Sequence, residues 1–124
     1  TRIRQAVMSA IASYHHALPL VLLATADAQQ HRSEAQQAGV ALVFEAFADR
    51  AYTDEGALVP RGEPGAVLAR EPMLAQVRQL CERGSVTTIG GRQLALSADT
   101  LCVHGDNAEG VAAIAAIRAL VDGR

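Results

Sequence analysis

The stretch VALVFEAFADR, residues 40–50, is a strongly apolar run that ends in the charged pair Asp49 and Arg50. An apolar run of this length, bounded in front by Gly39, is typical of a buried β-strand. We therefore predict a strand over 40–47, with its polar end directed out of the core. This strand decides the fold, because the segments on both sides of it alternate between helical and strand patterns.

The alternation extends over most of the chain. Besides the central strand, the pattern predicts helices over 28–38, 71–83 and 107–121, strands over 20–24 and 100–104, and a hairpin of 86–89 and 92–96. Gly39 and Gly84 are helix stops, and Gly90-Gly91 is a two-residue hairpin turn. Asp27 with Gln30 has the spacing of a capping box. Strands that alternate with helices predict βαβ units, a parallel sheet and an α/β fold.

The amino-terminal segment has an amphipathic pattern. Ile3, Val7, Ile11, Tyr14 and Leu18 recur at helical spacing, which predicts a helix with this apolar stripe. The sequence begins at Thr1, inside the pattern and without an initiator methionine, so we expect a fragment or a processed piece.

Composition bounds the possible functions. Half of the 124 residues are apolar, which is enough for the core of one modest domain. The net charge is −2 and no basic face is present, which argues against nucleic acid as a partner. No apolar run is long enough to span a bilayer. Cys81 and Cys102 lie among apolar neighbours, and we interpret them as reduced, buried thiols of a cytoplasmic protein.

Polar residues gather at the predicted carboxyl ends of two strands. They are Glu45, Asp49 and Arg50 on the central strand, and His104, Asp106 and Asn107 on the last strand. Because the carboxyl ends of parallel strands meet at one edge of a sheet, where such folds gather their active sites, we expect one shared pocket. The loop 51–67 is rich in glycine and proline and would return Arg61 toward it.

Each of these residues also has a structural interpretation. Asp106 with Glu109 could form a capping box for the last helix, and Asp49 with Arg50 could form a surface ion pair. His104 could be a structural histidine at the end of an apolar strand. Tyr52 could simply cover the apolar side of the loop. The pattern alone leaves these alternatives open.

Three segments carry a resemblance to a known family: EAFADRAYTDEGALVPR over 45–61, PGAVL over 64–68 and DTLCVHGDNAEG over 99–110. With them the sequence resembles the LamB/YcsF family over essentially its whole length, but it corresponds only to the carboxyl-terminal half of that family. The resemblance implies that residues 1–124 form the carboxyl-terminal part of a single irregular (β/α)7 TIM-like barrel. The missing amino-terminal half of the barrel would then be a partner.

The resemblance also implies a function. It implies the A-subunit role in a 5-oxoprolinase, which opens 5-oxo-L-proline to L-glutamate by ATP-dependent hydrolysis together with companion subunits B and C. Phosphorylation of the lactam oxygen by ATP would make the amide a better target for water. Because the sequence has no P-loop, a nucleotide site must be of another kind or be shared with a partner.

This chemistry assigns roles to the candidate residues. The catalytic group would be Glu45, Asp49, His104 and Asp106. The residues that bind substrate or phosphate would be Arg50, Tyr52, Arg61 and Asn107. The carboxylates could hold Mg²⁺ or move protons, and a histidine, with a reference pKa of ~6.5, suits a general base.

Two other functions stay open at this point. The first is a metal-dependent amide hydrolase or carbohydrate deacetylase, suggested by barrel relatives and by His104 with Asp106. The second is a non-catalytic structural fragment, because half of a barrel retains only part of any pocket. The uncovered edges of a partial barrel would also favour a homo-oligomer.

Overall fold

The structure of the protein, a computed structural model, describes residues 1–123. Its helices are α1 (Arg2–Ala12), α2 (Ala28–Ala38), α3 (Arg70–Arg83) and α4 (Ala108–Val121). Its strands are β1 (Leu20–Leu23), β2 (Leu42–Phe47), β3 (Ser85–Thr87), β4 (Gln93–Ala95) and β5 (Thr100–Cys102). The predicted types and order of the elements are confirmed. Apart from the first helix, each predicted boundary lies within two residues of the observed one.

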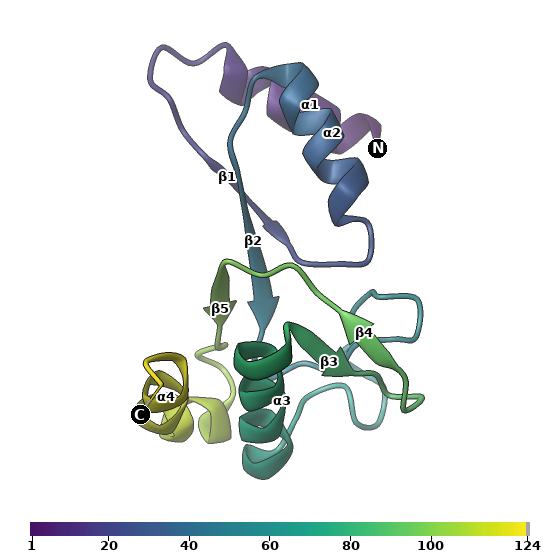
Figure 1. The fold of residues 1–124 in the computed structure, drawn as a ribbon, viewed down its shortest axis with the longest axis vertical. Helices are drawn as coiled ribbons and strands as arrows, with labels where there is room; N and C mark the ends of the chain where they lie inside the picture. The colour runs from purple at the N-terminus through teal and green to yellow at the C-terminus, as the bar shows by residue number, and fades with distance from the viewer. Residues whose placement is uncertain (124) are drawn as a thin grey trace.

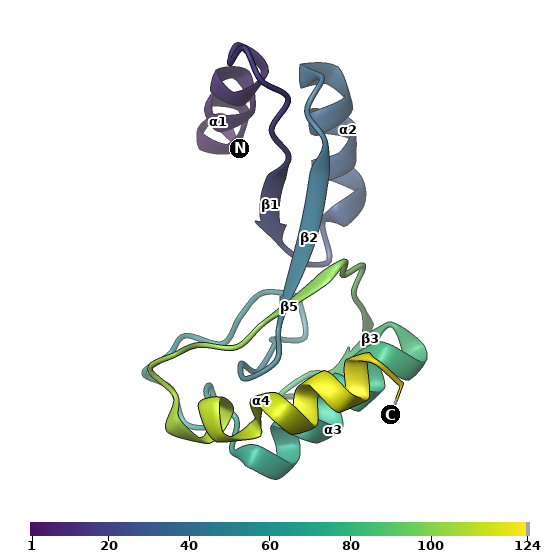
Figure 2. The same cartoon turned by 90° about the vertical axis from the view of Figure 1, so that its left-hand side faces the viewer.

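The main sheet has three parallel strands in the order β1-β2-β5. Leu20 pairs with Leu42, and Glu45 pairs with Thr100 on the other side of β2. The predicted parallel α/β arrangement is confirmed, and β3 and β4 form the predicted antiparallel hairpin. The central strand β2 connects two parts of the molecule, with α1, β1 and α2 at one end and β5, α3, α4 and the hairpin at the other (Figures 1 and 2).

The buried clusters take their sheet residues from one face only. Leu22, Phe44 and Leu101 belong to these clusters, as do the residues two positions before or after them on the same strands. Successive side chains of a strand point to opposite faces. The other face, which includes Glu45 and Phe47, contributes to none of the clusters in residues 1–123, and its Val21 is 51% exposed. The sheet is therefore packed on one side and open on the other.

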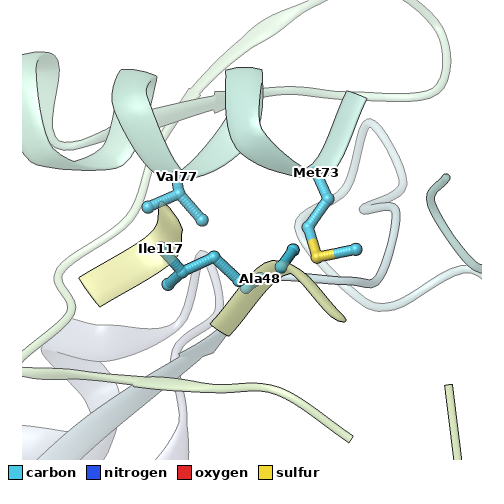
Figure 3. Packing of buried hydrophobic residues seen from close by; sticks show 5 residues of the cluster. Ala48, Met73, Val77 and Ile117 are labelled. Atoms are coloured by element: carbon cyan, nitrogen blue, oxygen red, sulfur yellow. The ribbon is translucent and has the colours of Figure 1, made fainter. Parts of the chain in front are cut away.

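Helices α3 and α4 pack against each other next to the end of β2. Their buried cluster consists of Ala48, Met73, Val77, Ala113 and Ile117, and Figure 3 shows Met73, Val77 and Ile117 directed toward Ala48. Helix α3 ends at Gly84, whose φ of 63° is the left-handed conformation that glycine adopts most easily. This packing fixes α3 beside the turn that leaves β2.

The predicted apolar stripe of the first helix is wrong. Helix α1 ends at Ala12, so Tyr14 and Leu18 lie beyond it, and Ile3 is 80% exposed. The face that packs on α2 instead carries Met8 and Ile11. Arg4 lies on the same face, one turn before Met8, and its guanidinium donates to the Glu34 carboxylate at 2.6 and 3.0 Å. An ion pair together with one fully buried methionine therefore sets the packed face.

The capping box predicted for Asp27 with Gln30 is wrong, and so is the alternative of a capping box formed by Asp106 with Glu109. Asp27 precedes α2 without a side-chain capping bond, and the Gln30 side chain donates to Glu34. Asn107, not Asp106, is the N-cap residue of α4. The Glu109 carboxylate accepts from the backbone N–H of Arg70, at the start of α3. Glu109 therefore caps the start of α3 and not the start of its own helix, α4.

The two cysteines have free thiols, but the prediction that both are buried is wrong, because Cys81 is exposed and Cys102 is only half-buried. Cys81 lies in a groove between α3, α4 and the edge of β5. None of the helices in residues 1–123 is long and apolar enough to cross a membrane.

Candidate active site

The candidate site forms where β2 and β5 end side by side. The backbone N–H of Ala48 donates to the carbonyl of Cys102 at 2.9 Å, so the pairing of the two strands continues one residue past the end of β2. Asp49 follows two residues after β2, and His104 follows two residues after β5. The predicted convergence of the two strand ends is thereby realised for these two side chains.

Asp49 and His104 form a closely bonded pair. His104 Nδ1 lies 2.8 Å from Asp49 Oδ1, and the His104 backbone N–H donates to Asp49 Oδ2 at 3.0 Å. The side-chain amide of Asn107 also donates to Oδ2, at 3.3 Å. Asp49 is 1% exposed. The backbone N–H of His104 and the Asn107 amide are both donors, as suits an ionised carboxylate.

The pKa of Asp49 agrees with this geometry. Burial by itself raises the pKa of a carboxyl group, but the hydrogen bonds from the His104 ring, the His104 backbone and Asn107 outweigh it. The pKa of Asp49 is therefore held below its ordinary value. A permanent negative charge lies against the histidine ring in the physiological range of pH.

The ionised carboxylate fixes the tautomer of His104. Because a carboxylate can only accept, the proton of the neutral ring is on Nδ1 and the lone pair is on Nε2. Within residues 1–123, no group forms a hydrogen bond with Nε2. The side chain is 25% exposed, and the Phe47 ring packs edge to face against it with ring centres 4.6 Å apart. Nε2 can thus accept a proton from a water or substrate molecule, as in a histidine–carboxylate catalytic pair.

A second polar residue supports the same turn, and it was not among the residues predicted from the sequence. Gln76 of α3 is 7% exposed, and its amide nitrogen lies 3.0, 3.2 and 2.9 Å from the carbonyl oxygens of Phe47, Ala48 and Arg50. One signal could have found it: Gln76 lies between Met73 and Val77 on the buried stripe of its helix, where a polar side chain needs a partner.

Arg50 and Tyr52 lie inside the loop that follows β2. The Arg50 guanidinium is buried and donates to the carbonyls of Val59 at 2.8 Å and Ala66 at 3.4 Å. The Tyr52 hydroxyl accepts from the Phe47 backbone N–H at 2.9 Å, and burial raises its pKa. Both residues hold the loop together instead of facing solvent. The alternative of a surface pair between Asp49 and Arg50 is wrong, because both are buried and bind different partners.

Arg61 and Asp106 meet at the surface beside the pair. Arg61 Nη1 donates to Asp106 Oδ2 at 2.5 Å, and the side chains are 48% and 64% exposed. Asp106 directly precedes Asn107, whose side-chain amide donates to Asp49 Oδ2 at 3.3 Å. The loop thus returns Arg61 to the strand ends, as predicted.

Glu45 stands apart from these residues. It lies on the open face of β2, and its side chain has no hydrogen-bond partner in the described range. The pKa of the Cys102 thiol is raised, mainly by burial and then by the negative charges of Glu45 and Asp49. Residues 1–123 contain no group of three or more His, Cys, Asp or Glu side chains that could hold a metal ion. Because Mg²⁺ is usually held by one or two carboxylates together with water and substrate phosphates, a role for these carboxylates in holding Mg²⁺ stays a prediction.

Comparisons with known proteins agree on one family. The LamB/YcsF family model matches residues 1–124. A relative named as the 5-oxoprolinase A subunit, from Chromohalobacter salexigens, is 52% identical over 117 residues, which cover 94% of this chain and 47% of the relative. A relative of the same name from Vibrio cholerae serotype O1 is 47% identical over 119 residues, which cover 95% of this chain and 48% of the relative.

A solved structure extends the likeness to the fold. The crystal structure of a lactam utilization protein from Thermus thermophilus matches with a TM-score of 0.76 and 34% identity. The match covers 97% of this chain and 47% of that protein. The chain therefore spans about half the length of the relatives it matches.

Proposed function

This chain belongs to the LamB/YcsF family, and from that membership we propose that it forms one wall of a 5-oxoprolinase active site. The reaction is the ATP-dependent hydrolysis of 5-oxo-L-proline to L-glutamate, carried out with companion subunits B and C. Its relatives are about twice as long, and the rest of the site would come from the half of such a protein to which this chain does not correspond. The names of its relatives support the reaction class.

One observation carries the assignment of roles: the Asp49–His104 pair at the ends of β2 and β5. His104 Nε2 accepts a proton from water, and the water oxygen attacks the lactam carbonyl carbon. The ring C–N bond then breaks, its nitrogen takes the proton from His104 to become the amino group of glutamate, and the phosphoryl group that ATP would place on the lactam oxygen would leave as inorganic phosphate. Asp49 holds the ring orientation and stabilises the imidazolium that forms. General base catalysis of this kind contributes roughly 10²–10⁴-fold.

The exposed Arg61 donates to Asp106, the residue before Asn107, and we assign it to the substrate carboxylate or to phosphate. Bound ATP would supply activation of the lactam oxygen. Because Arg61 already donates to Asp106, an incoming anion would compete with that carboxylate or share the guanidinium with it. The buried Arg50 is not placed for this role, since its donors are used by backbone carbonyls.

A metal-dependent amidase or deacetylase is less well supported. Such enzymes need a cluster of ligands, and the described residues hold none, while Asp49 is turned toward His104.

The proposal is tested by His104→Gln in the family-length protein mixed with subunits B and C. Glutamate formation from 5-oxoproline should fall by roughly 10²–10⁴-fold, because the general base is lost. His15→Gln, an exposed histidine after α1, is the matched control and should leave the rate unchanged. Full activity of the His104 variant, or no 5-oxoproline-stimulated ATP hydrolysis by the unmutated assembly, would contradict the proposal.

A further inference from the structure

The turn that carries Asp49 depends on a side chain from another element. The carbonyl oxygens of Phe47, Ala48 and Arg50 all lie within hydrogen-bond distance of the Gln76 amide nitrogen. These carbonyls flank Asp49 on both sides along the chain. A buried carbonyl without a hydrogen-bond donor destabilises the folded state. Here the donor is the side chain of Gln76. The position of the Asp49 backbone is thus tied to α3.

From this geometry we infer that Gln76 is a positioning residue for the Asp49–His104 pair. It touches neither side chain of the pair, and it acts by fixing the backbone on either side of Asp49. The carbonyl of Asp49 itself accepts from Leu68 N–H at 2.9 Å, so the turn is held from the loop as well. The kinetic part of this inference rests on the proposed function, whereas its structural part does not.

The residue type matters at this position. A glutamine amide carries two N–H donors and no charge. A glutamate of the same shape would direct a carboxylate at three carbonyl oxygens. A lysine or arginine could donate, but it would bring a positive charge close to Asp49 and compete with His104 for it. Glutamine therefore holds the turn and leaves the negative charge of Asp49 directed at the histidine.

Small displacements of this turn should matter for the chemistry. His104 Nδ1 and its backbone N–H both bind Asp49, at 2.8 and 3.0 Å, so a shift of the turn weakens both contacts together. A misplacement of ~1 Å near a reacting group can cost on the order of 10²-fold in rate. The helix packing of Met73 and Val77, which adjoin Gln76 on the same stripe, keeps α3 at a fixed distance from the turn.

The test is Gln76→Met, which is close in size but has no donor, with Gln79→Met as the control. Gln79 lies one turn later on α3 and donates to Ser85 and Gln93 of the hairpin, away from the site. The first readout is nitrogen NMR of the His104 ring, recorded at a pH at which the spectrum shows the neutral ring. Gln76→Met should reduce the Nδ1–H tautomer and its bonded proton signal, and Gln79→Met should not.

The second readout is steady-state kinetics of the complete enzyme. Gln76→Met should lower kcat by roughly 10-fold to 10²-fold with little change in KM, because the Gln76 amide is engaged with backbone carbonyls and is assigned no contact with the substrate. If Gln76→Met fails to fold, Gln76→Asn keeps the donors but shortens their reach, and it should show the same changes to a smaller degree. An unchanged tautomer and kcat in a folded but less stable variant would overturn the inference.

The two proposals fail separately. If His104→Gln keeps full activity, the proposed function is wrong, and the NMR readout alone still decides whether Gln76 positions the pair. If His104→Gln is inactive but the Gln76 variants retain both the tautomer and kcat, only the positioning role is wrong.

Discussion

Replacing Asp49 by asparagine exchanges one carboxylate oxygen for an amide nitrogen and removes the charge on which the candidate site is built. The remaining side-chain oxygen could still accept from the His104 backbone and from Asn107. The new amide nitrogen would then face His104 Nδ1, and two donors cannot bind each other. The ring would have to move its proton to Nε2, and the atom assigned as the general base would no longer have a lone pair. We therefore expect glutamate formation by the complete enzyme to fall roughly 10²–10⁴-fold.

The same change has a cost in stability that follows from the contacts. Asp49 accepts three hydrogen bonds. Bonds to a charged group contribute about 1.5–3 kcal/mol each and neutral ones about 1 kcal/mol, so weakening three of them loses a few kcal/mol. Part of this loss is offset because a buried charge no longer has to be desolvated. The expected decrease in the free energy of unfolding is about 1–3 kcal/mol.

The stability difference should depend on pH in one direction. The pKa of Asp49 in the folded protein lies below its value in the unfolded chain, which is about 3.9 for an ordinary Asp. Its stabilising contribution is therefore fully present above about pH 3.9 and is lost as the pH falls through the folded value. Urea unfolding should show the largest gap between the two proteins at neutral pH and a narrowing gap below about pH 3.9.

Asp27→Asn is the matched control, because Asp27 is exposed and makes no side-chain capping bond. It should leave activity unchanged and shift stability by less than about 0.5 kcal/mol. The reasoning is refuted if Asp49→Asn keeps the wild-type rate, or if its stability gap is as large at low pH as at neutral pH.

Three further predictions concern the scaffold. Met73→Ala should cost about 2–5 kcal/mol in urea unfolding, whereas Ile114→Ala, at a 51% exposed position of α4, should cost less than half as much; equal costs would contradict the packing in Figure 3. Glu34→Gln should lower stability at neutral pH, because the hydrogen bonds from Arg4 hold the pKa of Glu34 at about 2, and the difference should vanish as the pH falls from 4.5 toward 2; a pH-independent difference would refute it. Gly56→Ala should lower the melting temperature more than Gly62→Ala, because Gly56 has a φ of 87° and its added Cβ would lie 2.6 Å from Cβ of Ala26, while Gly62 has open space; similar shifts would argue against it.

Local patterns in the sequence were enough to predict the elements and the parallel sheet. The helix over 28–38 and its stop at Gly39 depend on side-chain spacing and on one left-handed residue, whose φ is 74°. Strand alternation likewise follows from a few adjacent residues. Such features are set within one turn or one strand, and distant parts of the chain rarely change them.

Partners were harder to predict than elements. Glu109 has the spacing to cap its own helix, yet it binds the first N–H of a helix that begins 39 residues earlier. Asp49 and His104 are 55 residues apart, and only the adjacency of β2 and β5 joins them. The sequence predicted which strand ends would meet there. It did not predict that Arg50 would be buried in the loop, and it left open whether Tyr52 only covers the loop, since both depend on how residues 51–67 fold back on β2.

The two buried or half-buried histidines show why His104 is better explained as a functional residue than as a structural one. His31 is 7% exposed, its Nδ1 has no partner, and burial, followed by the charge of Arg4, lowers its pKa. It stays neutral beside Phe44 and behaves as a packing residue. His104 has the opposite arrangement, with one nitrogen bound to a buried carboxylate and the other open. A ring needed only for packing would not require an ionised Asp49 held by three donors, because a neutral amide could fill the same space without the desolvation of a charge. The buried charge has a physical reason if the ring must repeatedly take up a proton.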